Sequence, residues 1–272
     1  MNLTSQPFEE PRSVQTARSR LQGKITVITG AGSGIGLAMA TRFAAEGAAV
    51  VAGDWNAARL DEAVARIQAA GGTIIGKRGD IADCATGESL VETAISSYGR
   101  IDALVNNAGV MDYMQGVAEL SDEVWRRVCS INLEGALFTM RKAIPYMLKQ
   151  GAGSIVNIAS TAGIEGGAAG AAYTISKHGL VGLTRNTAWM YAKQGVRCNA
   201  ICPGGTRTNI GETMPQDRLD LAGAARAGLY ATLIPATLEP EDIAALALFL
   251  VSDESRNING AIIPADAGWT AA

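Results

Sequence analysis

From residue 21 onward, short apolar runs alternate with longer amphipathic segments. The apolar runs are rich in β-branched residues and close at glycine or polar residues, as strands buried on both faces do. They predict strands at Lys24–Thr29, Ala48–Gly53, Thr73–Lys77, Ala103–Asn106, Ser154–Ala159, Val196–Ile201 and Ala261–Pro264. The segments between them predict helices at about Ile35–Glu46, Ala57–Ala70, Thr86–Tyr98, Asp122–Lys149, Tyr173–Lys193 and Glu241–Val251. This order predicts an α/β fold: a Rossmann-like, doubly wound, seven-stranded parallel sheet with helices on both faces.

One long segment departs from this rhythm. Residues 204–238 contain Pro215 and Pro235 and show no clean period. A connection of this length inside a compact domain is usually a lid or a binding loop, so we predict a substrate lid at about 204–238. No linker or internal repeat divides the rest. We therefore expect a flexible N-terminal arm at 1–20, followed by a single domain at 21–272.

Composition excludes several classes of protein. The 272 residues are 48% hydrophobic with a net charge of −3, and no run of basic residues forms a footprint for nucleic acid. No uninterrupted apolar stretch is long enough to span a membrane, so we expect no membrane association. The polar start of the chain lacks the apolar centre of a signal peptide, and Glu9 and Glu10 argue against a transit peptide.

Cysteine and histidine usage argues against a metal site. The four cysteines form no CxxC pair, and a single histidine, His178, cannot complete a ligand set with them. Cys198 and Cys202 lie in an apolar run, where a buried thiol is the ordinary interpretation. We expect a metal-free cytoplasmic protein with reduced thiols.

A glycine-rich turn, TGAGSGIG at Thr29–Gly36, joins the first predicted strand to the first predicted helix. Glycine is needed where backbone turns sharply and approaches a pyrophosphate, and the following helix directs its free N–H groups at the phosphates. An acid, Asp54, ends the next strand, as expected of a group that accepts hydrogen bonds from the adenosine ribose. The alternative role for Asp54 is a cap for the next helix.

Asp54 also bears on the choice of dinucleotide. A carboxylate about 4 Å from a 2′-phosphate costs roughly 4 kcal/mol at an effective dielectric near 20. No nearby arginine is expected to offset this charge, since Ser33 lies inside the glycine turn and Trp55 follows the acid. The sequence therefore predicts NAD as the cofactor, in preference to NADP.

A second constellation carries the chemistry of alcohol oxidation. Ser160 ends a predicted strand, and Tyr173 and Lys177 lie one helical turn apart on the same face. A free tyrosine, with a pKa near 10, is a poor base at neutral pH, and a nearby ammonium could lower that pKa by about three units. Taken alone, Tyr173 and Lys177 could belong to a solvated helix face, and Ser160 could be a helix cap. Because the same chain also has the glycine-rich turn, we favour a catalytic role for all three.

The chain resembles the short-chain dehydrogenase/reductase family, of the compact single-domain type, from about Leu21 to Trp269. The motifs that carry the resemblance are TGAGSGIG at Thr29–Gly36, NNAG at Asn106–Gly109, IN at Ile131–Asn132, SIVNIAS at Ser154–Ser160, YTISK at Tyr173–Lys177 and CPGGTRT at Cys202–Thr208. The resemblance implies that Tyr173 is the general acid/base and that Lys177 lowers its pKa and binds the nicotinamide ribose. Ser160 would hold the substrate oxygen, and Asn132 a water that links Lys177 to solvent.

The resemblance also implies the contacts of the dinucleotide. The predicted cofactor-binding residues are Gly30, Ser33, Gly34, Ile35, Gly36, Asp54, Asp80, Ile81, Asn106, Ala108, Gly109, Tyr173, Lys177, Pro203, Gly204, Thr206 and Thr208. Asp80, taken alone, could equally be a helix cap. Thr206 stands where family members often have an aliphatic residue, which leaves its contact open. A homotetramer is implied as well, with the helices around Asp122–Lys149 and Tyr173–Lys193 as contact surfaces.

The substrate is less constrained by the sequence. The segments after Gly109 and Ser160 and the predicted lid are mostly apolar, which favours a hydrophobic secondary alcohol or ketone. The pocket residues expected there are Val110, Met111, Tyr113, Met114, Ala162, Ile164, Met214, Leu219, Leu229 and Tyr230. Two alternatives to an NAD-dependent alcohol dehydrogenase stay open: a ketone or 3-oxoacyl reductase, and a non-catalytic NAD-binding sensor.

Overall fold

The computed structural model describes residues 19–271, so the predicted arm at 1–20 lies almost wholly outside the described residues. The sheet has seven strands, all parallel, which confirms the predicted α/β fold. The strands are β1 (Ile25–Thr29), β2 (Ala49–Asp54), β3 (Thr73–Arg78), β4 (Ala103–Asn106), β5 (Gly153–Ile158), β6 (Val196–Pro203) and β7 (Ile262–Ala265).

The order of the strands determines where a ligand can bind. It runs β3-β2-β1-β4-β5-β6-β7, so the winding direction reverses between β1 and β4. The register aligns Val27 of β1 with Leu104 of β4, and both strands end at the same edge of the sheet. Open parallel sheets bind ligands outside their carboxyl ends at such a reversal. The glycine turn follows β1 at this position.

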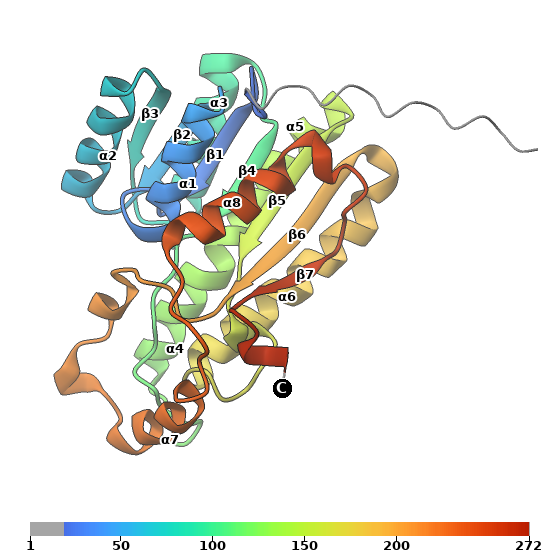
Figure 1. Cartoon of the computed structure of the whole chain (residues 1–272). Helices are drawn as coiled ribbons and strands as arrows, with labels where there is room; N and C mark the ends of the chain where they lie inside the picture. Colours follow the sequence, from blue (N-terminus) through green and yellow to red (C-terminus); the bar gives the residue numbers. More distant parts are fainter. Residues whose placement is uncertain (1–18, 272) are drawn as a thin grey trace, which may run out of the picture.

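Helices cover both faces of the sheet (Figure 1). They are α1 (Gly34–Ala45), α2 (Ala57–Ala69), α3 (Cys84–Tyr98), α4 (Asp122–Cys129), α5 (Gly135–Gln150), α6 (Ala171–Tyr191), α7 (Leu221–Ala231) and α8 (Pro240–Val251). Several begin at a side chain that accepts a backbone N–H: Asn56 caps α2, Asp83 caps α3 and Ser121 caps α4. These caps explain why the helices start where they do.

The two faces of the sheet are separate hydrophobic cores, because successive residues of a strand point to opposite faces. Val27 packs with α3 and α5, whereas Ile28 packs with α1 and α8. Phe43 of α1 is fully buried on one face and Met140 of α5 is almost fully buried on the other. Burial on both faces accounts for the nearly continuous apolar runs in the sequence.

One predicted helix is interrupted. A single helix was expected over Asp122–Lys149, but residues Ser130–Glu134 form a π-helix that divides α4 from α5. The wider turn leaves room for an extra residue, and Asn132 lies within it. Such π-turns are frequent at functional sites.

The segment 204–238 contains more structure than its pattern predicts. Its two ends lie side by side, since Leu238 N donates to Gly205 O at 2.8 Å and Thr206 pairs with Leu238. Between them the chain forms two short 3₁₀ turns and the helix α7, which the sequence analysis missed. The segment, orange in Figure 1, projects beyond the carboxyl ends of the strands.

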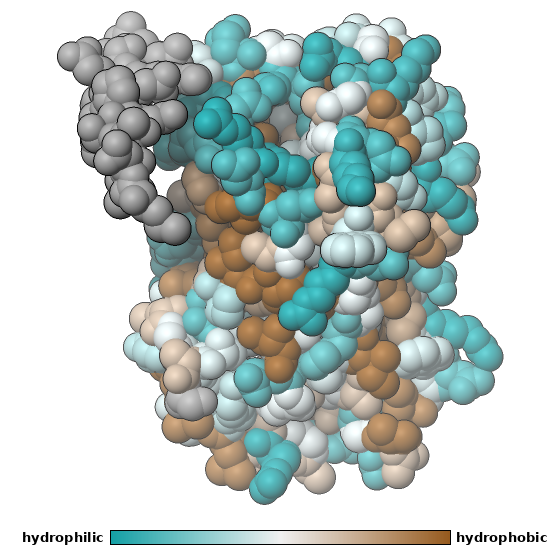
Figure 2. All heavy atoms as spheres, turned by 90° about the vertical axis from the view of Figure 1, so that its right-hand side faces the viewer, coloured by the Kyte–Doolittle hydropathy of each residue, from teal (hydrophilic) through white to brown (hydrophobic). Residues whose placement is uncertain are grey.

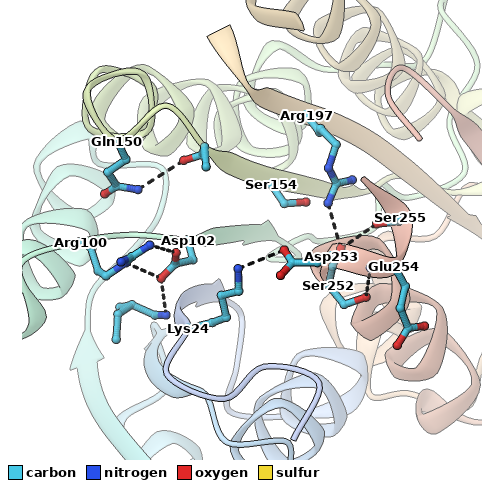
Figure 3. A network of polar contacts seen from close by, with 12 residues as sticks. Lys24, Arg100, Asp102, Gln150, Ser154, Arg197, Ser252, Asp253, Glu254 and Ser255 are labelled. Atoms are coloured by element: carbon cyan, nitrogen blue, oxygen red, sulfur yellow. Dashed lines mark hydrogen bonds and ion pairs between the residues drawn. The ribbon is translucent and has the colours of Figure 1, made fainter. Parts of the chain in front are cut away.

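The opposite edge of the sheet is held by a polar network (Figure 3). The Asp102 carboxylate accepts a hydrogen bond from Ile25 N at 2.9 Å and pairs with Arg100 at 2.6 Å. Arg197 donates to the carbonyl oxygens of Ile258, Leu250 and Ser252. These contacts join the amino ends of β1, β4 and β6 to the end of α8, so this edge has a structural role.

Candidate functional site

A cavity of about 910 Å³ opens at the carboxyl edge of the sheet, around the ends of β1, β2 and β4 to β6. It brings together most of the residues predicted from sequence. Its lining includes Gly30, Ser33, Gly34, Ile35, Asp54, Asp80, Ile81, Ala108, Gly109, Ser160, Tyr173, Lys177, Pro203, Gly204, Thr206 and Thr208. Gly36, Asn106 and Asn132 lie behind this wall.

The glycine turn is packed so closely that side chains are excluded. A β-carbon built on Gly36 would lie 1.9 Å from Gly30 O, and one on Gly30 would lie 2.9 Å from the Ala108 Cα. Gly34 has a φ of +50°, and Thr208 of the 204–238 segment covers it. These contacts seat the first turn of α1 directly against the end of β1.

Helix α1 presents unpaired N–H groups to the cavity. Its N-cap, Ser33, makes no side-chain capping hydrogen bond to any described residue, unlike Asn56 at α2. Uncapped N–H groups and the positive end of a helix dipole favour an anion such as a phosphate. The turn therefore fits the pyrophosphate of a dinucleotide.

Asp54 is built into this turn. It is 7% exposed; its Oδ2 accepts from Gly32 N and its Oδ1 from Asn56 N, both at 2.9 Å. Asn56, and not Asp54, caps α2. The acid is thus fixed at the wall of the cavity and retains lone pairs for a further donor.

An arginine that the sequence analysis missed lies beside this acid. Arg59, in the first turn of α2, lines the same part of the cavity, and its Nη2 donates to Glu212 Oε2 of the 204–238 segment at 2.7 Å. The expectation that no arginine lies nearby is therefore wrong. Arg59 lies five positions after Asp54. Its side chain reaches the cavity because α2 begins at Ala57, directly after the strand end, which the sequence pattern alone did not reveal.

The remaining residues that were predicted to contact the adenosine divide into two groups. Asp80 is exposed at the cavity, and its Oδ1 accepts from Ala82 N at 3.0 Å, while Asp83 caps α3. The Asn106 side chain instead faces the core, because it bonds Asn157 and Thr139 at 2.8 and 2.6 Å. Its neighbour Asn107 lines the cavity and donates to Thr29 O and Gly30 O, which steadies the glycine turn.

Ser160, Tyr173 and Lys177 meet at the far end of the cavity, beyond β5. The Lys177 Nζ donates to Ile158 O at 2.9 Å and lies 5.5 Å from the centre of the Tyr173 ring. Tyr173 is 6% exposed and Lys177 3% exposed, so both side chains are almost wholly buried in the cavity wall. Ser160 Oγ accepts from Ala162 N at 3.1 Å, which fixes its side chain.

Burial dominates the pKa values of this group. It raises the pKa of Tyr173 to about 12; the Ser160 hydroxyl acts in the lowering direction and the Asp112 carboxylate in the raising direction. Burial also lowers the pKa of Lys177 to about 8. The protein groups alone therefore do not produce the expected lowering of the tyrosine pKa, because the ammonium faces the ring and both groups are desolvated.

Asn132 is held by the π-helix next to Lys177. Its Oδ1 accepts from Val110 N at 2.8 Å, and its Nδ2 donates to Val110 O and Ser176 Oγ. A β-carbon built on Gly109 would lie 3.4 Å from this Oδ1 and 3.5 Å from Lys177 Nζ, so amide and ammonium flank the same glycine. An asparagine inside an apparent helix was the sequence signal for this arrangement.

Asp112 is a second residue that the sequence analysis missed. It is fully buried, and its carboxylate accepts from Tyr173 N at 2.9 Å, Gly170 N at 3.2 Å and Met114 N at 3.1 Å. It therefore joins the loop after β4 to the start of α6, which carries the tyrosine. No local pattern marks its link to α6, since Gly170 and Tyr173 lie about sixty positions away.

The part of the cavity where the sequence predicts the substrate is lined by apolar side chains and by one arginine. Val110, Met111 and Tyr113 line it as expected, together with Ala168. Arg127 also lines it, with its guanidinium 5.6 Å from the Tyr113 ring centre. The other expected pocket residues do not line the cavity: Met114, Ala162, Ile164, Met214, Leu219, Leu229 and Tyr230.

Comparison with known proteins agrees with this geometry. A family model described as enoyl-(acyl carrier protein) reductase matches residues 30–270. A 3beta-hydroxysteroid dehydrogenase 2 of Eggerthella lenta is 40% identical over 92% of this chain and 96% of its own length. The chain belongs to the short-chain dehydrogenase/reductase family. The short chain dehydrogenase adrF of Penicillium rubens is 42% identical over 93% of this chain and 99% of its own.

The chain is also similar in structure to a solved protein of this kind. Levodione reductase superposes with a TM-score of 0.84 and 35% identity, covering 92% of this chain and 99% of its own. Members with such names are dehydrogenases and reductases, and the chain is accordingly an oxidoreductase of this family. Within residues 19–271, no helix has the length and apolar character to cross a membrane, and no cluster of three or more His, Cys, Asp or Glu could hold a metal ion.

Proposed function

We propose that this protein is an NAD(H)-dependent dehydrogenase that transfers a hydride between a hydrophobic, cyclic secondary alcohol and the nicotinamide. The observation that carries the proposal is one cavity that joins the glycine turn and Asp54 at one end to Ser160, Tyr173 and Lys177 at the other. A dinucleotide-binding sensor without catalysis would have no use for the second group, so we favour an enzyme.

The residues present fit a dinucleotide. The uncapped start of α1 and the close-packed glycines would hold the pyrophosphate, and Asp54 the adenosine ribose. Pro203 and Gly204, which line the cavity with Tyr173 and Lys177, would hold the nicotinamide side, and Thr208, which covers Gly34, would lie nearer the pyrophosphate. When bound in its oxidised form, the nicotinamide supplies the hydride acceptor and a positive charge.

Side chains of the protein would transfer the proton that accompanies the hydride. In oxidation Tyr173 Oη takes the proton of the substrate hydroxyl, and in reduction it returns that proton to the carbonyl oxygen. Ser160 holds the same oxygen by a hydrogen bond. Lys177, fixed by Ile158 O, provides the positive charge next to the developing tyrosinate, and Asn132 steadies the loop after β4 through Val110. The burial of Tyr173 and Lys177 strengthens the electrostatic interactions between these groups.

The substrate class follows from the cavity wall and the relatives. Val110, Met111 and Tyr113 form an apolar surface beside the tyrosine, which suits a ring system with few polar groups. One relative at 40% identity is named a 3beta-hydroxysteroid dehydrogenase, which supports a hydroxylated polycyclic compound. The segment 204–238 would act as the lid, because Thr213 and Asp220 bond the loop that carries these side chains.

We also propose a homotetramer in the cytoplasm. Ile175, Trp189 and Met190 are exposed apolar residues of α6. Figure 2 shows hydrophobic side chains gathered on the face of the molecule that lies to the right in Figure 1, the side on which α6 lies. Such a surface on an enzyme is commonly covered by a second subunit. The buried, reduced thiols Cys198 and Cys202 suit the cytoplasm. Light scattering should give the mass of four chains, and a monomer at assay concentration would contradict this.

The test of the reaction is nicotinamide reduction by the purified protein. NAD and NADP are supplied in parallel with linear, aromatic and polycyclic secondary alcohols, including a 3β-hydroxysteroid. Turnover with NAD and a polycyclic alcohol would support the proposal. Preferred turnover with NADPH and a 3-oxoacyl thioester would support the reductase alternative, and tight NAD binding without turnover of any substrate would support the sensor.

A further inference from the structure

We infer that Glu212, in the 204–238 segment, is a specificity-determining residue for the dinucleotide: it occupies Arg59 and thereby prevents that arginine from accepting a 2′-phosphate. The inference rests on the proposed use of NAD and deepens it. It assigns part of the cofactor preference to a residue that lies far in sequence from the glycine turn and from Asp54.

The position of Arg59 is the first step. A β-carbon built on Gly32 would lie 2.9 Å from Asp54 Oδ2 and 3.2 Å from Arg59 Cβ, so the acid and the arginine flank the same point of the glycine turn. Arg59, Asp54, Trp55 and Glu212 all line the same cavity. In dinucleotide-binding folds, an acid at this place binds the ribose hydroxyls and a nearby arginine accommodates a 2′-phosphate. The chain therefore has both determinants, with opposite preferences.

The partner of Arg59 is the second step. Its Nη2 donates to Glu212 Oε2 at 2.7 Å, across a sequence separation of 153 residues. The side chains are 36% and 61% exposed, so the ion pair itself adds little to the stability of the fold. Its consequence is electrostatic: Glu212 neutralises the arginine that flanks Gly32 together with Asp54, and adds a second carboxylate to the same part of the cavity.

The rest of the segment keeps Glu212 in place. Thr213 Oγ1 accepts from Met111 N at 2.9 Å, and Arg127 Nη2 donates to Thr213 O at 3.0 Å. Glu212 therefore lies next to a residue anchored to the loop after β4. The carboxylate is presented to Arg59 by a fixed backbone.

The experiment measures dissociation constants for NAD and NADP by titration calorimetry, without substrate. Glu212→Gln should free Arg59, tightening NADP about tenfold, as expected for one new charge-assisted contact, and changing NAD less than about twofold. Adding Arg59→Gln to this variant should reverse the gain. The double variant distinguishes a freed arginine from the mere loss of a carboxylate.

The matched control is Glu123→Gln. Glu123 pairs with Arg218 at 2.9 Å and also joins the body of the protein to the 204–238 segment, but neither residue lines the dinucleotide cavity. This variant should leave the NADP-to-NAD ratio unchanged. An unchanged ratio in Glu212→Gln, or equal weakening of both dinucleotides, would overturn the inference. The ion pair would then serve only to hold the 204–238 segment against α2.

The two proposals fail in different ways. If the unaltered protein binds NAD and the ratio does not respond to Glu212→Gln, only the role of Glu212 is refuted. If the unaltered protein binds neither dinucleotide, the proposed function fails and the inference with it. The variants change exposed side chains at Glu212 and Glu123 and a half-buried one at Arg59, and circular dichroism would confirm that each is folded.

Discussion

Gly36→Ala is the sharpest perturbation of the dinucleotide cradle. The substitution adds one methyl group in the first turn of α1, where alanine would ordinarily favour the helix. At this position the new β-carbon would lie 1.9 Å from Gly30 O and 2.6 Å from Asn107 Nδ2. An ordinary contact is about 3.5 Å, so the start of α1 must move away from the glycine turn by well over an ångström.

The expected cost follows from what that movement disturbs. Overpacking of this kind costs about 3 kcal/mol when backbone must yield, since no flexible side chain can move aside. For a domain of this size the melting temperature should fall by at least about 6 °C. Because the N–H groups of α1 also shift away from the phosphates, NAD binding should weaken about tenfold or more.

The assay compares this variant with Gly228→Ala, using thermal melting and NAD titration. Gly228 lies in α7, and a β-carbon there meets nothing within 4 Å. This control should keep its affinity and gain up to about 1 kcal/mol of helix stability. If Gly36→Ala melts and binds NAD like the unaltered protein, the close-packed cradle described above is refuted.

Two further predictions concern the buried polar groups. Asp112→Asn removes a negative charge that raises the pKa of Tyr173, so the pH profile of kcat/KM for alcohol oxidation should shift toward lower pH. A variant that only loses stability, with an unmoved profile, would leave Asp112 a purely structural residue. Burial lowers the pKa of Lys177 from 10.5 to about 8, so the unfolded chain binds more protons between these values and stability should rise with pH there. The stability advantage of Lys177→Met over the unaltered protein, measured by urea unfolding, should therefore shrink between pH 8 and 10.5. A constant difference would contradict the assigned burial.

The sheet was predictable because most strands carry a largely apolar run; β3, which ends in Gly76, Lys77 and Arg78, is the weakest case. The run at Ala103–Asn106 gives β4 its observed bounds, and the other strands differ by only one or two residues at their ends. Helix boundaries were harder to predict where they depend on contacts between residues far apart in the sequence. The only sequence signal of the π-helix at Ser130–Glu134 is an asparagine within a helical pattern. Helix α7 is rich in alanine and glycine and buries no residue, so its sequence shows no hydrophobic period.

The site was predictable where chemistry follows a motif and not where it depends on long-range contact. The motifs place Asp54, Ser160, Tyr173 and Lys177 around one cavity. Asp112 and the Arg59–Glu212 pair could not be found in this way, since their partners are brought together only by folding. For Asn106 the motif predicts only that its backbone passes near the ribose; the structure adds that its side-chain amide bonds Asn157 and Thr139 in the core.

The central claim is that Tyr173 moves the proton in an NAD-dependent oxidation, and Tyr173→Phe tests it most directly. The variant removes one oxygen from a buried ring and keeps the packing of α6. NAD affinity by titration should stay within about twofold, while kcat for the best alcohol of the panel should fall by at least about a hundredfold, as general acid–base catalysis requires. Turnover near that of the unaltered protein, with NAD still bound, would contradict the account.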